Sequence, residues 1–257
     1  MTKWSEKEKK QNRSILYRLY IKENKTIKEI GIILQVSEKT IYKRLKTLNI
    51  KTIRFKKLNF CNKRNDIKIP KYSSGLAEFF GIMLGDGNIS RSQVVITLGN
   101  KEKDYVIYVQ NKIKTLFGGN PKISVRKTGY RDVYLGSVEI VNWLKKGGMV
   151  YNKVRSQVGI PKWILVNKNY YKAFVRGFFD TDCSIYRLKH GNQISFTNYS
   201  LPILKSLQKM LFELQYKPSA ISSYKIYITK KRNIVRFFKE IKPKNVKHLK
   251  RFNSLKE

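Results

Sequence analysis

Two short helices are predicted within the first fifty residues from the spacing of their apolar side chains. Ile27, Ile30 and Leu34 recur at helical spacing, and the pattern breaks at Gln35 and Val36. A second helix is expected to begin after Ser37, a residue type favoured at the N-cap. Its two faces differ in chemistry, with Ile41, Leu45 and Leu48 on one side and Lys39, Thr40, Lys43 and Arg44 on the other.

Residues 1–50 are therefore predicted to form a small all-helical domain that resembles a helix-turn-helix. In that interpretation the second helix contacts the major groove of DNA through Lys39, Thr40 and Lys43. A plain helical hairpin with a solvated basic face is the alternative. Over residues 51–72 the periodicity is lost and Lys and Arg accumulate, which predicts a basic linker.

The remaining chain carries the same order of elements twice, in residues 73–165 and 166–257. Each copy opens with an apolar helical stretch, LAEFFGIMLGDGNI in the first and YKAFVRGFFDTDCSIY in the second. Strand-like segments, a helix, further alternating strands and a final helix follow. This pattern predicts a duplicated half-domain, in which Asp86 and Asp182 occupy matching positions.

Small residues recur at every fourth position of both opening stretches. They are Ala77, Gly81 and Gly85 in the first copy, and Ala173, Gly177 and Thr181 in the second. A four-residue period gives one continuous stripe along a helix, and such a stripe lets two backbones approach closely. The two helices are therefore expected to pack against each other and to end side by side.

Asp86 and Asp182 would then meet at the C-terminal ends of two helices. The helix dipole disfavours a carboxylate there by about 0.3 to 1 kcal/mol, and mutual repulsion adds to that cost. A divalent cation would reverse the balance, because Mg²⁺ prefers hard oxygen ligands. An acid pair without metal is the alternative.

The charge of the chain points to a polyanionic partner. Lys and Arg number 55 against 17 acids, a formal net charge of +38. The basic residues are spread among many Tyr and Phe, which is typical of a folded nucleic-acid binder. With no long apolar run and no signal peptide, we expect no membrane association and a cytoplasmic location, or an organellar matrix for an organelle-encoded chain. Cys61, Cys183 and two histidines predict neither a disulfide framework nor a zinc cluster.

The stretches FFGIMLGDG and VRGFFDTDC resemble the paired motifs of the LAGLIDADG homing endonucleases in their single-chain, two-repeat form. The resemblance covers about residues 72 to 257. It implies an α+β fold in which two pseudo-symmetric αββαββα repeats form a DNA-binding saddle, here preceded by the helix-turn-helix domain. It also implies a monomer with internal pseudo-two-fold symmetry.

The same resemblance implies roles at the site. The last acid of each motif, Asp86 or Asp182, is expected to bind Mg²⁺, for which Mn²⁺ would substitute. Gly85 and Thr181 are the neighbouring ligand positions. Lys153 and Lys247 follow their repeats at comparable places and are expected to act near the attacking water. Asp180 occupies an earlier acidic position and is expected to be structural or peripheral.

Two further pairs of matching positions affect the site. Asn100 and Asn198 correspond between the repeats, and each would lie near the metals or cap the next helix. The glycine that normally follows the metal-binding acid is Gly87 in the first motif but Cys183 in the second. Glycine there tolerates positive φ and a close approach to DNA. Cys183 is therefore expected to strain or shift Asp182, which would slow the second half-site or favour nicking.

Alternation along the strands predicts which side chains face DNA. Lys122, Ser124 and Arg126 would oppose Ile123 and Val125, while Ser223, Lys225, Tyr227 and Thr229 would oppose Tyr224, Ile226 and Ile228. The full set predicted to contact DNA from the repeats comprises Arg91, Asn100, Lys122, Ser124, Arg126, Arg187, Gln193, Ser195, Thr197, Asn198, Lys225 and Tyr227. For each one alone, a solvated sheet face is the alternative.

The function implied by the resemblance is that of a free-standing homing endonuclease, serving intron homing. It would hydrolyse both strands of a long asymmetric DNA target with the help of Mg²⁺. A transcription regulator on an inactive LAGLIDADG scaffold is one alternative, although retention of both acids argues against it. An RNA-splicing maturase that binds its own intron RNA is another.

Overall fold

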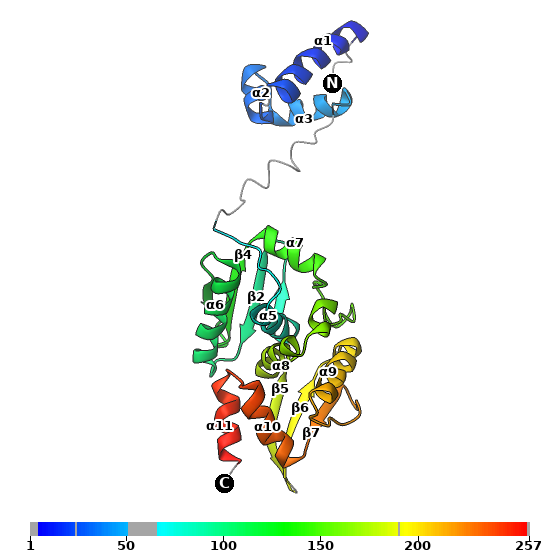
Figure 1. The fold of residues 1–257 in the computed structure, drawn as a ribbon. Helices are drawn as coiled ribbons and strands as arrows, with labels where there is room; N and C mark the ends of the chain where they lie inside the picture. Colours follow the sequence, from blue (N-terminus) through cyan, green and yellow to red (C-terminus); the bar gives the residue numbers. More distant parts are fainter. Residues whose placement is uncertain (1–4, 24, 51–65, 190, 256–257) are drawn as a thin grey trace. The chain divides into compact units, whose positions relative to one another are not determined.

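The computed structural model describes residues 5–23, 25–50, 66–189 and 191–255 (Figure 1). The chain divides into two compact units, Met1–Lys63 and Arg64–Glu257. Residues 51–65, most of the predicted basic linker, lie outside the described residues. Throughout the described chain, every helix is too short or too polar to span a bilayer.

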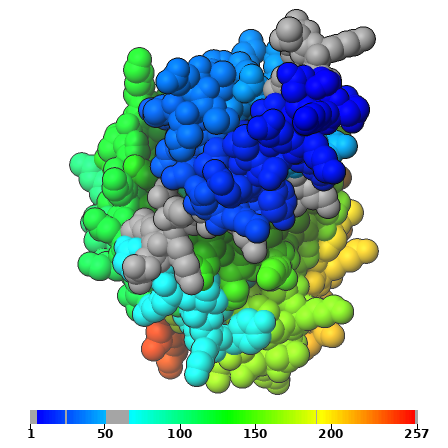
Figure 2. All heavy atoms as spheres, turned by 90° about the horizontal axis from the view of Figure 1, so that it is seen from above, coloured from blue at the N-terminus to red at the C-terminus, as the bar shows by residue number. Residues whose placement is uncertain are grey.

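The N-terminal unit is entirely helical in its described part. It contains α1 (Glu6–Tyr17), a π-helical turn η1 (Arg18–Lys22), α2 (Ile27–Ile33) and α3 (Glu38–Thr47). These helices, dark to light blue in Figure 2, surround one apolar cluster. The cluster includes the predicted residues Ile27, Ile30, Ile41, Leu45 and Leu48, joined by Leu16, Leu19, Tyr20 and Ile50.

The turn between α2 and α3 has the sequence features that were predicted for it. Gln35 has a φ of +48°, and Ser37 Oγ accepts the backbone N–H of Thr40 at 3.2 Å as the N-cap of α3. A Cβ on Gly31 would lie 2.8 Å from the carbonyl oxygen of Val36, so only glycine allows this close return of the chain. The two helices and their boundary are confirmed, whereas their reading of DNA stays a prediction.

The first half of the C-terminal unit contains three helices and four strands. In chain order these are α5 (Ser74–Leu84), β1 (Gly87–Ile89), β2 (Gln93–Leu98), α6 (Lys103–Phe117), β3 (Lys122–Val125), β4 (Arg131–Gly136) and α7 (Val138–Lys146). The strands form an antiparallel sheet of order β1-β2-β4-β3. Helices α6 and α7 pack against this sheet (Figure 1).

Within the described residues, the second half repeats this order with one strand fewer and one helix more. After a 3₁₀ turn η2 (Lys162–Val166) come α8 (Lys168–Asp182), β5 (Cys183–Leu188), β6 (Gly191–Thr197), α9 (Leu201–Glu213), β7 (Lys225–Ile228), α10 (Lys231–Ile241) and α11 (Val246–Ser254). The sheet is antiparallel with order β5-β6-β7. Where β3 stands in the first half, Ser222 makes only an isolated bridge to Lys225. The α+β fold and its internal duplication are thus confirmed.

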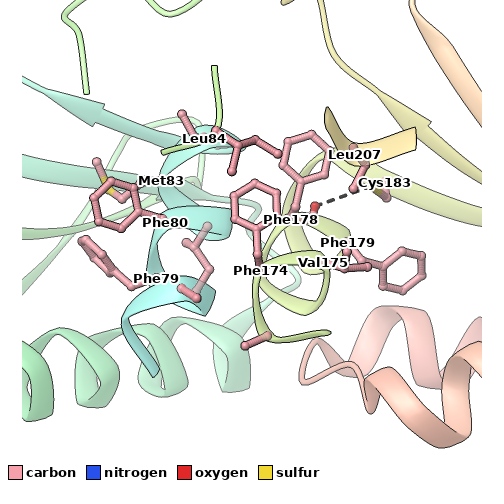
Figure 3. Close-up of a cluster of buried hydrophobic side chains, with 14 of the residues drawn as sticks. Phe79, Phe80, Met83, Leu84, Phe174, Val175, Phe178, Phe179, Cys183 and Leu207 are labelled. Atoms are coloured by element: carbon pink, nitrogen blue, oxygen red, sulfur yellow. Dashed lines mark hydrogen bonds between the residues drawn. The ribbon is translucent and has the colours of Figure 1, made fainter. Parts of the chain in front are cut away.

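Helices α5 and α8 lie side by side at the centre of the C-terminal unit (Figure 1). A Cβ on Gly81 would stand 2.8 Å from the backbone N of Phe178, and one on Gly177 would stand 3.0 Å from the backbone N of Ile82. The first distance is shorter than real Cβ contacts and the second is tighter than nearly all of them, so the predicted stripe of small residues does permit the close approach. Aromatic side chains of both helices fill the space beside this seam (Figure 3).

A buried charge also crosses the seam. Glu78 of α5 is buried, and its Oε2 lies 3.2 Å from Nη1 of Arg176 on α8 and 3.2 Å from Nζ of Lys112 on α6. The Tyr108 hydroxyl donates to Oε1 of the same carboxylate. Because a buried carboxylate is stable only when paired, these contacts fix the register of the two helices.

Candidate active site

The two matching acids stand together where the central helices end. Helix α5 ends at Leu84, so Asp86 follows just beyond it, whereas α8 extends through Asp182. A Cβ on Gly85 would lie 2.8 Å from Cβ of Thr181 and 3.5 Å from Cγ of Asp182. The close approach of the helices therefore continues to their ends and places both half-buried carboxylates in one site.

Burial dominates the electrostatics of this pair. Burial, followed by the charge of Asp182, raises the pKa of Asp86 to about 7, against the opposing effect of Lys247 and Lys153. Burial also raises the pKa of Asp182, although Lys153 and a hydrogen bond from Asn198 act in the other direction. Two carboxylates held at this cost are typical of a functional site that receives a cation.

Lys153 binds the C-terminal end of α5. Its Nζ donates to the carbonyl oxygens of Met83 at 3.0 Å and Leu84 at 3.1 Å, and also to that of Gly85. These carbonyls have no partner within the helix, and a cation at a helix C-terminus is favourable. Burial lowers the pKa of Lys153, while Asp182 and Asp86 act to raise it. The ammonium is thus beside both acids, while its expected role near the attacking water stays a prediction.

Lys247 is held differently, by an acid that the sequence analysis missed. Its Nζ lies 2.7 Å from Oε1 of Glu102, which also accepts Nδ2 of Asn245 at 2.6 Å, while Glu102 Oε2 accepts the backbone N–H of Gly99 at 2.6 Å. Burial acts to raise the pKa of Glu102, yet the hydrogen bonds from Lys247 and Asn245 outweigh it and lower the pKa. Glu102 is the N-cap residue of α6, so its position alone suggested an ordinary helix start.

A comparison with known proteins finds one family model that matches part of the chain. Residues 169–242, which carry α8 and Asp182, match the family model of the LAGLIDADG-like domain. The second repeat contains a LAGLIDADG-like domain. The matched residues include Asp182 and the sheet β5-β6-β7. The motif helix α8 and the sheet that follows it are therefore parts of one domain.

Several solved structures are similar to the chain at low identity. The N-terminal LAGLIDADG domain of DUF199/WhiA is 18% identical over 68% of this chain and 86% of that chain, with a TM-score of 0.49. The homing endonuclease I-DmoI in complex with DNA and Mn is 16% identical over 65% and 96%, with a TM-score of 0.46. I-WcaI bound to its DNA recognition sequence is 12% identical over 68% and 82%, with a TM-score of 0.47. No curated protein matches the chain significantly.

The two matching asparagines have different surroundings. In the LAGLIDADG-like domain, Asn198 donates from Nδ2 to Oδ2 of Asp182 at 2.9 Å, and its Oδ1 accepts the backbone N–H of Ser200 at 2.9 Å. It therefore lies at the acid and also binds the backbone of Ser200, the N-cap residue of α9, although α9 itself has no side-chain cap. Asn100 is exposed, and only its backbone oxygen is engaged, by Nη1 of Arg131 at 2.6 Å.

Asp180 is structural, as expected. It is fully buried, and its carboxylate accepts the backbone N–H of Lys244 at 2.9 Å and that of Asn245 at 3.1 Å. Burial raises the pKa of Asp180 to about 7 in spite of these two hydrogen bonds. The contacts fix the start of α11, the helix that delivers Lys247 to the site.

The expected strain at Cys183 is wrong. Cys183 has an extended backbone, with φ −125° and ψ 169°, and its buried thiol lies 3.5 Å from the Phe178 carbonyl oxygen (Figure 3). Gly87 does not have a positive φ either. It must be glycine because a Cβ would lie 2.5 Å from Cα of Met83. The difference arises because α8 continues through Asp182 whereas α5 stops two residues before Asp86.

Three positions on the strands depart from the predicted alternation. Val125, expected in the core, is 62% exposed at the edge of its sheet. Ser195, expected to face DNA, is only 3% exposed because it lies between Ser184 and Tyr227 on neighbouring strands. Tyr224, also expected in the core, is 44% exposed because it belongs to a turn and β7 begins at Lys225.

Arg126 is exposed but already paired. Its Nε lies 2.7 Å from Oδ2 of Asp132, and its Nη2 lies 3.1 Å from Oγ1 of Thr97. The other predicted DNA contacts are accessible to different degrees. Lys39, Lys43, Arg91, Lys122, Ser124 and Arg187 are exposed, while Thr40, Gln193, Thr197, Lys225 and Tyr227 are half-buried. Ser37 hydrogen-bonds Thr40, and Tyr186 hydrogen-bonds Gln193.

The chemistry of the site fits a divalent metal ion. Asp86 and Asp182 offer hard carboxylate oxygens in one place. Burial raises the pKa of both, and a bound cation would favour their charged forms. Of the other predicted ligand positions, Gly85 gives its carbonyl oxygen to Lys153, and Thr181 directs its hydroxyl to the Gly177 carbonyl oxygen. Within the described residues no third His, Cys, Asp or Glu completes a metal-binding group. Further ligands would have to come from water or phosphate.

Proposed function

We propose that the protein is a site-specific double-stranded DNA endonuclease of the homing type, which hydrolyses phosphodiester bonds with a divalent metal. The pairing of Asp86 and Asp182 at the ends of two helices that touch through glycine carries this proposal. The net charge of +38 supports nucleic acid as the substrate. Monomeric action and a supplementary DNA contact by Lys39, Thr40 and Lys43 belong to the same proposal.

The two acids and the two lysines of the site would have different roles in cleavage. Asp86 and Asp182 would hold Mg²⁺ or Mn²⁺, which supplies Lewis acidity and lowers the pKa of a bound water. Lys153 and Lys247 provide positive charge beside the acids, where the phosphorane-like transition state gains negative charge. Hydrolysis forms a bond from the water oxygen to phosphorus and breaks the P–O3′ bond. The products are a 5′-phosphate and a 3′-hydroxyl, with one proton released to solvent.

The test uses a randomised duplex DNA library and the full chain. In Mg²⁺ we expect discrete ends at one long site with short 3′ overhangs, and in Ca²⁺ binding without cleavage. Asp86→Asn and Asp182→Asn should abolish cleavage and keep binding. Specific binding that is never followed by cleavage under any divalent ion would overturn the enzyme and favour a regulator. Preference for structured RNA over duplex DNA would favour a maturase.

A further inference from the structure

An exposed pair of tyrosine rings lies on the second half of the C-terminal unit. Tyr199 follows β6 and is 61% exposed, and Tyr224 precedes β7 and is 44% exposed. Their ring centroids are 5.3 Å apart, with an angle of 52° between the planes. Exposed aromatic rings beside basic groups such as Lys225 are typical of surfaces that stack on nucleobases.

The backbone under both rings is tied to the acid site. The N–H of Asn198 donates to the carbonyl oxygen of Tyr224 at 3.1 Å, and its side chain donates to Asp182 at 2.9 Å. On the other side, Nε2 of Gln157 donates to the carbonyl oxygen of Tyr199 at 3.1 Å. The backbone that carries each ring is therefore held beside Asn198, the residue that hydrogen-bonds the candidate metal ligand Asp182.

Tyr224 occupies a backbone conformation that suits glycine. Ser222 and Lys225 exchange two backbone hydrogen bonds, at 3.1 and 2.9 Å, around a two-residue turn. Its central residues, Ser223 and Tyr224, have φ values of +48° and +58°. Hairpin turns with positive φ at both positions favour Asn-Gly, and a bulky residue there is strained.

The first half uses glycine at the corresponding place. Gly129, the last residue of the hairpin turn before β4, has a φ of +84°, and a Cβ there would lie 3.1 Å from Cβ of Asn100. Asn100 is the partner of Asn198 in the duplication. The first repeat therefore has Gly129, which adopts a positive φ without strain, where the second repeat has the exposed ring of Tyr224. Strain of this kind persists at sites where a function requires it.

We propose that Tyr199 and Tyr224 form an aromatic platform that stacks on a nucleobase or deoxyribose of the DNA strand held at Asp182. This inference rests on the proposed binding of DNA. Loss of one stacking ring is expected to weaken binding roughly 5- to 100-fold. The pair of rings would belong to the second half-site, since Gly129 has no side chain, although Tyr130 beside it is 50% exposed.

Photo-crosslinking tests the contact without a known target. The full chain is bound in Ca²⁺ to a randomised duplex library with 5-iododeoxyuridine in place of thymidine, irradiated, digested and examined by mass spectrometry. We expect adducts on Tyr199 or Tyr224. Binding with adducts on other residues alone would overturn the platform and leave the proposed function standing. Failure to bind the library in a mobility-shift assay would overturn both.

Substitutions at Tyr224 separate a contact with DNA from a purely structural role. Tyr224→Gly and Tyr224→Ala both lose the ring, but only glycine relieves the positive φ, so the glycine variant should have the higher Tm. Both should weaken binding equally, whereas Tyr224→Phe should bind as the parent does. If affinity instead follows Tm across the three variants, the platform is overturned.

Tyr72→Ala is the matched control. Tyr72 is also 61% exposed and stacks on Trp163 with centroids 4.4 Å apart, but it lies before the N-terminal end of α5, away from the acids. This variant should keep its affinity for the bound duplex, while Tyr199→Ala should lose it. Equal loss in both would overturn the proposal, because it would show a general effect of removing a surface ring.

Discussion

Asn198 donates a hydrogen bond from Nδ2 to Oδ2 of Asp182 at 2.9 Å, whereas its counterpart Asn100 makes no such contact with Asp86 within the described structure. The two halves of the site are therefore chemically unequal. Lys153 donates hydrogen bonds to carbonyl oxygens at the end of α5, whereas Lys247 forms an ion pair with Glu102. This difference adds to the asymmetry. Each half should respond differently to substitution and to pH.

Asn198→Ala should slow cleavage of one strand more than the other. Its hydrogen bond lowers the pKa of Asp182, so its loss raises that pKa and requires a higher pH for ionisation. A hydrogen bond to a charged group contributes about 1.5 to 3 kcal/mol, or roughly a 10- to 150-fold effect on rate. Strand-specific nicking rates measured against pH should show the acid limb displaced upward. Asn100→Ala is the control, and an identical displacement there would contradict the asymmetry.

Asp86→Asn should stabilise the metal-free protein at neutral pH. The pKa of Asp86 is raised from 3.8 to about 7, so the folded state binds the proton more tightly than the unfolded state. Stability is therefore highest below pH 4 for this group and falls as pH rises towards 7, by on the order of 2 to 4 kcal/mol. Urea unfolding in chelator at several pH values should show this fall diminished in the variant.

Asp132 is a control for the urea experiment, because its pKa is shifted in the opposite direction to that of Asp86. Burial acts to raise the pKa of Asp132, but hydrogen bonds from Arg126 and Thr97 outweigh it and lower the pKa. Its contribution is present above the unfolded pKa and is lost as pH falls. Asp132→Asn should thus destabilise the protein at neutral pH. Destabilisation of similar size by Asp86→Asn would refute the assignment of Asp86 as a carboxylate held at a cost.

Gly177→Ala should disrupt the central seam. The added methyl would lie 3.0 Å from the backbone N of Ile82 and still closer to the carbonyl oxygen of Glu78, so the helices must separate. Overpacking of this kind costs about 1 to 3 kcal/mol, measurable as a lower urea midpoint. Gly136→Ala is a suitable control, because the nearest atom there is 3.9 Å away. Equal effects of the two changes would mean that helix contact is not limiting.

Lys39→Gln combined with Lys43→Gln should reduce the salt dependence of DNA binding. Both side chains are exposed on α3, where the sequence predicts contact with the major groove. Two lost phosphate contacts would lower the slope of log K against log salt by about 1.8. The doubly substituted Lys7→Gln, Lys28→Gln variant removes equal charge from α1 and α2. If both variants change the slope alike, α3 is not the reading helix.

The sequence predicted most of the scaffold because its apolar periodicity is regular. Three patterns could be read from the order of residues alone and are present in the structure. They are the stripe with Gly81 and Gly177, the N-cap at Ser37 and the duplicated order of elements. Helix α1 was not predicted, because the apolar residues Leu16, Leu19 and Tyr20 are too few for a clear period and pass through a π-helical turn.

The site was predictable only where a motif marked it. Glu102 could not be assigned, since its role depends on Asn245 and Lys247 from the other end of the chain. The burial of Ser195 depends on neighbours contributed by β5 and β7, and the exposure of Tyr224 depends on a turn without glycine. Contacts between distant segments and unusual turns leave little local signal.

The glycine seam also limits how such a protein can be rebuilt. Because each central helix touches the other's backbone directly, a half taken from a different chain must present glycine at the same turn and a matching partner for Glu78. Chimeras that exchange one half to obtain a new recognition sequence should therefore fail unless the opposite helix is redesigned with it. The two halves can diverge freely on their outer faces. Where α5 and α8 are in contact, however, a change in one helix requires a matching change in the other.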